Sequence, residues 1–363
     1  MAKRRRRAAV VGATGVAGQQ FLVSLGQHPW FEVKRLAASE RSAGKKYKDA
    51  ISDPASGATR WFCDEPCPKA VWDIVVEDAQ KLALDDVDIV FTAIESDAAK
   101  VVEPLYAKRV PVISTASAFR YEADVPVLVP GVNIDHAALL AVQQKNRGWK
   151  GFIAPGPNCT TVGLAISLKP LHDRFGIRSV IMTSLQAVSG AGRSPGVLSY
   201  DILDNVVPYI PKEEEKVQTE AQKILGLLSG KAIVPAPFNV SCTCTRVNVI
   251  DGHTEAVFVG LQKQASLEEV QAAWREVYKE FLALGLPSAP PELVHYTAEP
   301  FRPQPRLDRG LHDGMATVIG RLRHDNVLPH GIKYVLLSHN TKMGAGKGAV
   351  LTAEYLIQRG LIK

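Results

Sequence analysis

The feature that most constrains the fold is a glycine-rich turn close to the N-terminus. Residues 8–11 are apolar, GATGVAG occupies residues 12–18, and residues 16–26 carry apolar side chains at helical spacing. This order predicts a buried strand, a tight turn and a helix. The turn amides and the positive end of the helix can hold a pyrophosphate, although a tight turn without a ligand needs the same glycines. The residues expected to contact a dinucleotide here are Gly12, Thr14, Gly15 and Val16.

Strand and helix patterns alternate through the first part of the chain. Short apolar runs at 33–37, 74–76, 87–94 and 110–114 are separated by helical segments such as 97–108. Alternation of this kind predicts an α/β domain with a doubly wound parallel sheet, the Rossmann-type architecture.

The pattern changes in the second part of the chain. Longer strand-like runs at 179–188, 240–250 and 254–262 predict a mostly antiparallel sheet. The dipeptide Asp251-Gly252 lies between the last two runs and predicts a hairpin there.

These patterns predict two domains, because 363 residues exceed the size at which one hydrophobic core usually divides. We expect a dinucleotide-binding domain over residues 1–157 and an α+β catalytic and dimerisation domain over residues 158–344. The C-terminal segment 345–363 is predicted to be helical and can pack back on the first domain.

Charge and cysteine content exclude several classes of partner. The net charge of +6 owes much to one basic run at residues 3–7, and no aromatic-rich module accompanies it, so we expect no nucleic-acid partner. No uninterrupted run of 18 apolar residues occurs, so we expect no membrane span. Five cysteines in a pattern that fits neither a disulfide framework nor a zinc site predict a cytoplasmic protein without a bound metal.

The segment after the second predicted strand bears on cofactor choice. Ser39, Arg41 and Ser42 stand where a site specific for NAD usually has an acidic residue, and they could contact a ribose 2′-phosphate. This favours NADP as the cofactor. Glu40 leaves NAD open, because its carboxylate could instead accept a hydrogen bond from a bare ribose hydroxyl.

Cys159 is the candidate nucleophile. It lies in Pro157-Asn158-Cys159-Thr160-Thr161, at the predicted start of a helix, where exposed amides and the helix dipole favour a thiolate. A thiolate suits acyl transfer, because the thioester that it forms is a good hydride acceptor with a good leaving group. Without further context, a buried cysteine acting as a small apolar residue is an equal alternative.

Several longer motifs decide between these readings. In chain order they are GATGVAG, ASERSAGK, PNCTT, SLQAVSGAGR, DNVVPYI, EEEK, CTRVNVIDGHTE, RPQPRLDR and HNT. Over nearly its whole length the chain resembles aspartate-β-semialdehyde dehydrogenases, especially the branch typical of archaea and fungi.

The resemblance implies catalytic roles for three residues. The family's nucleophile matches Cys159, its acyl-positioning glutamine matches Gln186, and its general acid/base matches His253. Asn158 and the Cys159 amide would then be the oxyanion donors.

It also implies binding residues. Arg246 matches the arginine that binds the substrate α-carboxylate, and Arg120 matches a phosphate-binding arginine. Glu213 and Lys216 match residues that receive the substrate ammonium and help to hold its phosphate. The cofactor residues implied in this part of the chain are Ser189, Gly190 and Asn340, the last of which a helix cap would also explain.

The implied reaction is the NADPH-dependent reduction of L-aspartyl-4-phosphate to aspartate semialdehyde and phosphate, by a homodimer or homotetramer acting on a small-molecule substrate. A malonyl-CoA or succinyl-CoA reductase of the same ancestry needs the same cysteine, histidine and arginine, and stays an alternative. The chain also departs from the family at Gly131, where a glutamate is usual, at Cys242-Thr243-Cys244 and at residues 342–347.

Overall fold

The computed structural model describes residues 4–192 and 199–363, so Lys3 of the basic run and Arg193 of SLQAVSGAGR lie outside the described residues. The chain forms two compact units. Unit 1 comprises Met1–Pro126, Ala137–Gly156 and Ala345–Lys363, and unit 2 comprises Val127–His136 and Pro157–Gly344.

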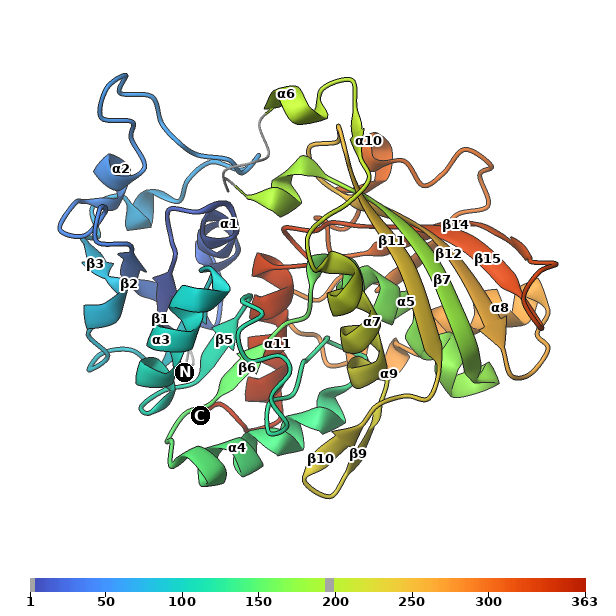
Figure 1. Ribbon diagram of the computed structural model, residues 1–363. Helices are drawn as coiled ribbons and strands as arrows, with labels where there is room; N and C mark the ends of the chain where they lie inside the picture. The colour runs from blue at the N-terminus through green and yellow to red at the C-terminus, as the bar shows by residue number, and fades with distance from the viewer. Residues whose placement is uncertain (1–3, 193–198) are drawn as a thin grey trace. The chain divides into compact units, whose positions relative to one another are not determined.

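Unit 1 contains a six-stranded sheet in the order β3-β2-β1-β4-β5-β6, with every pair parallel (Figure 1). The strand order reverses between β1 and β4, which is the point where doubly wound sheets bind their ligands. The predicted Rossmann-type domain is therefore confirmed. Its strands are β1 (Arg6–Val11), β2 (Phe31–Ala38), β3 (Val76–Asp78), β4 (Ile89–Thr92), β5 (Val112–Ser114) and β6 (Ile153–Pro155). Its helices are α1 (Val16–Leu25), α2 (Tyr47–Ala50), α3 (Ser96–Ala107), α4 (Leu139–Arg147) and α11 (Gly346–Gln358), with short 3-10 turns η1 (Lys69–Val71) and η2 (Ala79–Lys81).

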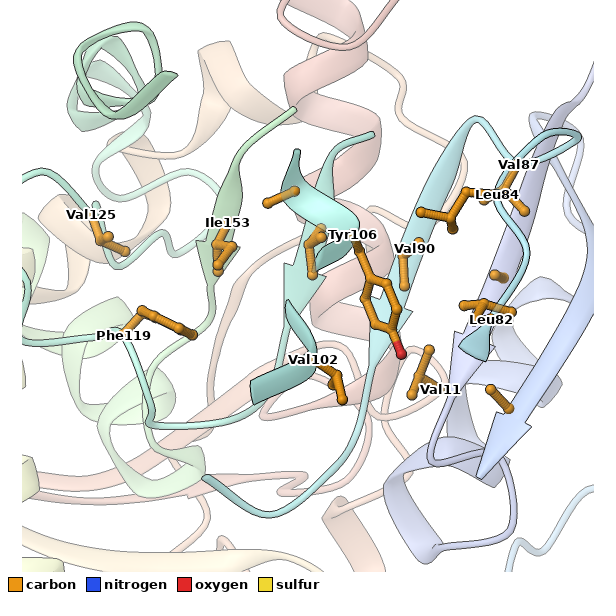
Figure 2. Close-up of a cluster of buried hydrophobic side chains, with 14 residues drawn as sticks. Val11, Leu82, Leu84, Val87, Val90, Val102, Tyr106, Phe119, Val125 and Ile153 are labelled. Carbon is orange, nitrogen blue, oxygen red and sulfur yellow. The ribbon is translucent and has the colours of Figure 1, made fainter. Parts of the chain in front are cut away.

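The core of unit 1 explains why its strands appear as short apolar runs in the sequence. A parallel sheet is covered on both faces, so every residue of β4, β5 and β6 and the last four residues of β1 are buried. Figure 2 shows the ring of Tyr106 among Val11, Val90 and Val102, which belong to one buried cluster.

Helix α11 packs in unit 1, against α1 and β5. His28 and Glu354 attach it to the segment that follows α1, through a buried contact of 2.7 Å between Nε2 and Oε1. The C-terminal segment Ala345–Lys363, which follows unit 2 in the sequence, therefore belongs to unit 1.

Unit 2 contains a seven-stranded mixed sheet in the order β13-β14-β15-β12-β7-β11-β8, in which four of the six pairings are antiparallel. The predicted α+β domain with a mostly antiparallel sheet is confirmed. The strands are β7 (Ile177–Gln186), β8 (Val206–Val207), β11 (Asn239–Val247), β12 (His253–Leu261), β13 (Val294–Tyr296), β14 (Thr317–His324) and β15 (Ile332–Ser338), and β9 (Leu227–Ser229) pairs with β10 (Ala232–Val234). The helices are α5 (Cys159–Phe175), α6 (Ser199–Ile202), α7 (Glu213–Ile224), α8 (Leu267–Glu276), α9 (Lys279–Leu282) and α10 (Pro305–Asp308), with 3-10 turns η3 (Ile134–Ala138), which begins in unit 2 and ends in unit 1, and η4 (Val188–Ala191).

The predicted hairpin at Asp251-Gly252 is wrong. Strands β11 and β12 do not pair with each other, because β7 lies between them, parallel to β11 and antiparallel to β12 (Figure 1). The Asp251-Gly252 turn therefore belongs to a connection that passes the end of β7. A tight hairpin turn and a connection across one strand can carry the same dipeptide, so local sequence did not distinguish them.

Gly131 lies in a segment that groups with unit 2. It has a φ of +79°, and a Cβ there would come within 2.9 Å of Leu293 Cδ1 and 3.2 Å of Phe281 Cδ1. Glutamate would be strained and crowded at this position, so packing accounts for the glycine.

Among the described residues, every helix is too short or too polar to span a bilayer.

Candidate active site

Cys159 is the first residue of α5, and Asn158 caps this helix. The Asn158 side-chain oxygen accepts hydrogen bonds from the backbone amides of Thr160 at 2.9 Å and Thr161 at 3.4 Å. The predicted helix start is therefore present, and the half-buried Cys159 lies at the positive end of a 17-residue helix.

His253 is fully buried at the start of β12, and its Nε2 lies 3.2 Å from Cys159 Sγ. Its other nitrogen, Nδ1, accepts a hydrogen bond of 3.1 Å from the backbone amide of Ala187. Burial, with the charges of Arg246 and His339, lowers the pKa of His253 to about 3. The imidazole is therefore neutral at physiological pH, with its proton on Nε2 facing the sulfur.

The ends of three adjacent strands bring the other candidates to the same edge of the sheet. Arg246 of β11 pairs in register with Gln186 of β7, and His253 begins β12 on the other side of β7. The Arg246 guanidinium donates to Ala187 O at 2.8 Å and to Gln186 Oε1 at 3.5 Å, while Gln186 Nε2 donates to Ser184 Oγ at 3.2 Å. Arg246, Gln186 and His253 thus converge because β7 separates the two strands that the sequence suggested were paired.

Gly190 follows β7 and lies against this group. A Cβ at Gly190 would come 2.9 Å from both Arg246 Nη1 and His253 Cε1. Only glycine leaves both side chains in place.

Asn340, which follows β15, makes hydrogen bonds to the segment after β7 and to the connection between β11 and β12. Its Nδ2 donates to Ser189 Oγ at 2.8 Å, and its Oδ1 accepts from the amide of Gly252 at 2.9 Å. The residue at the N-cap of the following helix is Ala345, so Asn340 does not have the capping role that the sequence left open.

Helix α7 contributes acidic side chains to Asn158. Glu213 is buried, accepts from Asn158 Nδ2 at 2.8 Å, and lies 3.5 Å from the Lys216 ammonium. Glu220, two turns later, accepts from the backbone amide of Asn158 at 2.6 Å. Sequence reasoning missed Glu220, although its spacing of seven residues from Glu213 places both on one face of a helix.

The glycine-rich turn of unit 1 has the geometry that a bound phosphate needs. Gly12 has a φ of +82°, and a Cβ there would come 2.1 Å from Ala93 O. Helix α1 begins after Gly15 with no side-chain cap and no acidic residue in its first turn. The amides at this helix start are therefore not covered by a cap from their own chain.

The remaining candidates also lie in unit 1. Ser39 and Arg41 are exposed after β2, with Ser42 partly exposed, and Arg41 makes no hydrogen bond or ion pair with the residues that the structure describes. Arg120 is buried and donates to Thr115 O at 2.8 Å.

Comparison with known proteins identifies the family. The model for the semialdehyde dehydrogenase NAD binding domain matches residues 7–140, and that for the semialdehyde dehydrogenase dimerisation domain matches residues 168–343. Aspartate-semialdehyde dehydrogenase of Methanothermobacter thermautotrophicus is 45% identical over 96% of this chain and 97% of its own length. The chain belongs to the aspartate-semialdehyde dehydrogenase family. The resemblance that the motifs indicated is confirmed.

Fungal members and solved structures extend this comparison. The Saccharomyces cerevisiae aspartate-semialdehyde dehydrogenase is 40% identical over 99% of both chains. The crystal structure of the Candida albicans enzyme with NADP has a TM-score of 0.87, 39% identity and coverage of 99% of this chain and 100% of its own. The structure of Vibrio cholerae aspartate semialdehyde dehydrogenase II, complexed with ASA, has a TM-score of 0.76, 27% identity and coverage of 98% and 99%.

Proposed function

We propose that this member of the aspartate-semialdehyde dehydrogenase family reduces L-aspartyl-4-phosphate with NADPH to L-aspartate-4-semialdehyde and phosphate, through a thioester on Cys159. The observation that carries the proposal is the approach of Cys159 Sγ to His253 Nε2 at the positive end of α5. Family membership supports the same reaction.

The residues of unit 1 fit NADP. The amides that follow Gly15, at the helix start that has no side-chain cap, suit the pyrophosphate, and Gly12, Thr14 and Val16 lie in the same turn. Arg41 is an exposed cation between Ser39 and Ser42, a donor set that suits a 2′-phosphate. In unit 2, we assign Ser189, Gly190 and Asn340 to the nicotinamide end. The Candida albicans relative, solved with NADP, supports this cofactor, which supplies a hydride when bound.

We assign substrate binding to four charged side chains. Arg246 would bind the α-carboxylate by two parallel hydrogen bonds. Glu213 would receive the ammonium, with Lys216 and Arg120 holding the phosphate. Gln186, held between Ser184 and Arg246, would orient the acyl group.

The reaction then follows from the geometry at Cys159. The thiolate attacks the acyl carbon, the Cys159 amide and the second N–H of the Asn158 side chain stabilise the oxyanion, and the carbon–oxygen bond to phosphate breaks. The N–H on His253 Nε2 donates to sulfur, which stabilises the thiolate before attack and again when the reduced acyl group leaves. His253 thus acts as a hydrogen-bond donor to the sulfur; with its proton on Nε2 and Nδ1 occupied by the Ala187 amide, the imidazole has no free nitrogen facing the sulfur to take a proton.

One experiment separates this proposal from an acyl-CoA reductase. Purified protein and NADP are supplied either with aspartate semialdehyde and phosphate or with malonate semialdehyde and coenzyme A. NADPH formation is followed by the absorbance of the reduced nicotinamide. Turnover with the first pair alone supports the proposal. Turnover with the second pair alone would overturn it in favour of the reductase.

We propose in addition that unit 2 is the catalytic and dimerisation domain and unit 1 the dinucleotide-binding domain. The face of β7 away from α5 exposes Ile181 and Leu185, 45% and 41% accessible, which suits cover by a second copy in a homodimer or homotetramer. The match of residues 168–343 to a dimerisation domain supports this assignment. A cytoplasmic location is proposed because all five cysteines, each within the described part of the chain, are unbridged.

A further inference from the structure

Asn158, the residue before the nucleophile, makes at least one hydrogen bond through each of its four polar atoms, the backbone N and O and the side-chain Oδ1 and Nδ2. Its side-chain oxygen caps α5 and its Nδ2 donates to Glu213, as described above. Its carbonyl accepts from the amide of Val162 at 3.2 Å. Its own backbone amide precedes the first turn, has no partner within the helix, and donates to Glu220 Oε2 at 2.6 Å.

Glu220 is the unexpected member of this set. It is 1% exposed, and burial of a carboxylate is costly unless hydrogen bonds compensate for lost water. A carboxylate acceptor makes the bond to the Asn158 amide short and roughly twice as strong as a bond between neutral groups. An exposed glutamate on the same helix, such as Glu215, keeps its water and has no desolvation cost. The buried position of Glu220 therefore indicates a specific role for its carboxylate.

The bond to Glu220 controls the peptide that leads into Cys159. Rotation of the Pro157–Asn158 peptide would carry Cys159 with it and change the 3.2 Å separation of Sγ from His253 Nε2. Misplacement of a reacting group by about 1 Å can cost about a hundredfold in rate. Glu213 anchors only the side chain of Asn158 and Val162 only its carbonyl, so the backbone N–H of Asn158 is held by Glu220.

We propose that Glu220 is a positioning residue, whose carboxylate holds the Asn158 amide and so sets the position of the Cys159 nucleophile. Its effect on the overall reaction rests on the proposed function. Its effect on the reactivity of Cys159 does not.

The test compares Glu220→Met with Glu220→Gln. Both remove the charge and keep a similar unbranched shape, but only glutamine keeps an oxygen that can accept from the Asn158 amide. Readouts are kcat and KM for aspartate semialdehyde and NADP, and the rate at which p-nitrophenyl acetate acylates Cys159. We expect kcat and acylation to fall about 10- to 100-fold in Glu220→Met, with both KM values nearly unchanged, and glutamine to restore most of the rate. Equal rates in the two variants would overturn the proposal.

A second measurement covers the case in which Glu220→Met does not fold. Hydrogen exchange on the wild-type protein reads the Asn158 amide directly, and the proposal requires it to be protected; rapid exchange would refute the anchoring. If wild type acylates but does not turn over aspartate semialdehyde, the proposed function fails. A slower acylation of Glu220→Met than of Glu220→Gln would then still support the role of Glu220.

Discussion

Replacing Glu255 with glutamine should increase the stability of the protein relative to wild type as the pH rises. Glu255 lies on β12, opposite Ser184 of β7 and Leu336 of β15. Its side chain is fully buried, and neither carboxyl oxygen has a hydrogen-bond partner among the described residues. Burial, with a smaller effect of Cys244, raises the pKa of Glu255 well above its usual range, so the folded protein holds it as a neutral acid.

The magnitude follows from the difference between the folded and unfolded states. An unfolded glutamate ionises with a pKa of about 4.3, while the folded group stays protonated. The contribution of Glu255 to stability is therefore fully present below that pH and is lost at about 1.4 kcal/mol per pH unit as the pH rises towards the folded pKa. Between pH 5 and pH 7 this loss in the wild type has an upper bound of about 2.7 kcal/mol, reached when the folded carboxyl group stays protonated over the whole interval. Glutamine is neutral in both the folded and the unfolded state, so its contribution to stability does not change with pH.

Urea unfolding at pH 5 and pH 7, followed by tryptophan fluorescence, measures this change. The free energy of unfolding of Glu255→Gln relative to wild type should increase between the two pH values, by at most about 2.7 kcal/mol. Any difference in packing between the side chains cancels, because it is the same at both pH values. The exposed Glu215→Gln is the matched control and should show little change. A gap between Glu255→Gln and wild type that is equal at pH 5 and pH 7 would refute the assignment of a neutral buried acid.

Three further substitutions test the site. Cys159→Ser should abolish turnover while calorimetry shows near-normal NADPH binding, because an alkoxide is hard to generate and its ester accepts hydride poorly; activity like that of wild type would contradict the mechanism. Arg41→Ala should weaken NADP binding about 10- to 100-fold and leave NAD binding nearly unchanged, since only NADP carries the 2′-phosphate; equal losses would show that Arg41 contacts something else. Glu213→Gln should lower kcat/KM for aspartate semialdehyde by about one to two decades and hardly affect its analogue without the amine. A matching loss on both substrates would make Glu213 structural, through its bond to Asn158.

The sequence by itself determined the features that depend on neighbours along the chain. The strand, glycine turn and helix at residues 6–25 formed as predicted, because the φ of +82° at Gly12 and the helix that follows are local requirements. The start of α5 at Cys159 was predictable for the same reason, since Asn158 caps amides only two and three residues away.

The tertiary structure alone decided which distant segments meet. Strands β11 and β12 are close in sequence, yet each pairs with β7, and this placed Arg246, Gln186 and His253 together. The anchoring of Asn158 by Glu220 joins residues 62 positions apart, and α11 returns to unit 1 from the far end of the chain. Strand pairing and helix docking depend on side-chain contacts formed after the chain has folded back on itself, so no local pattern encodes them.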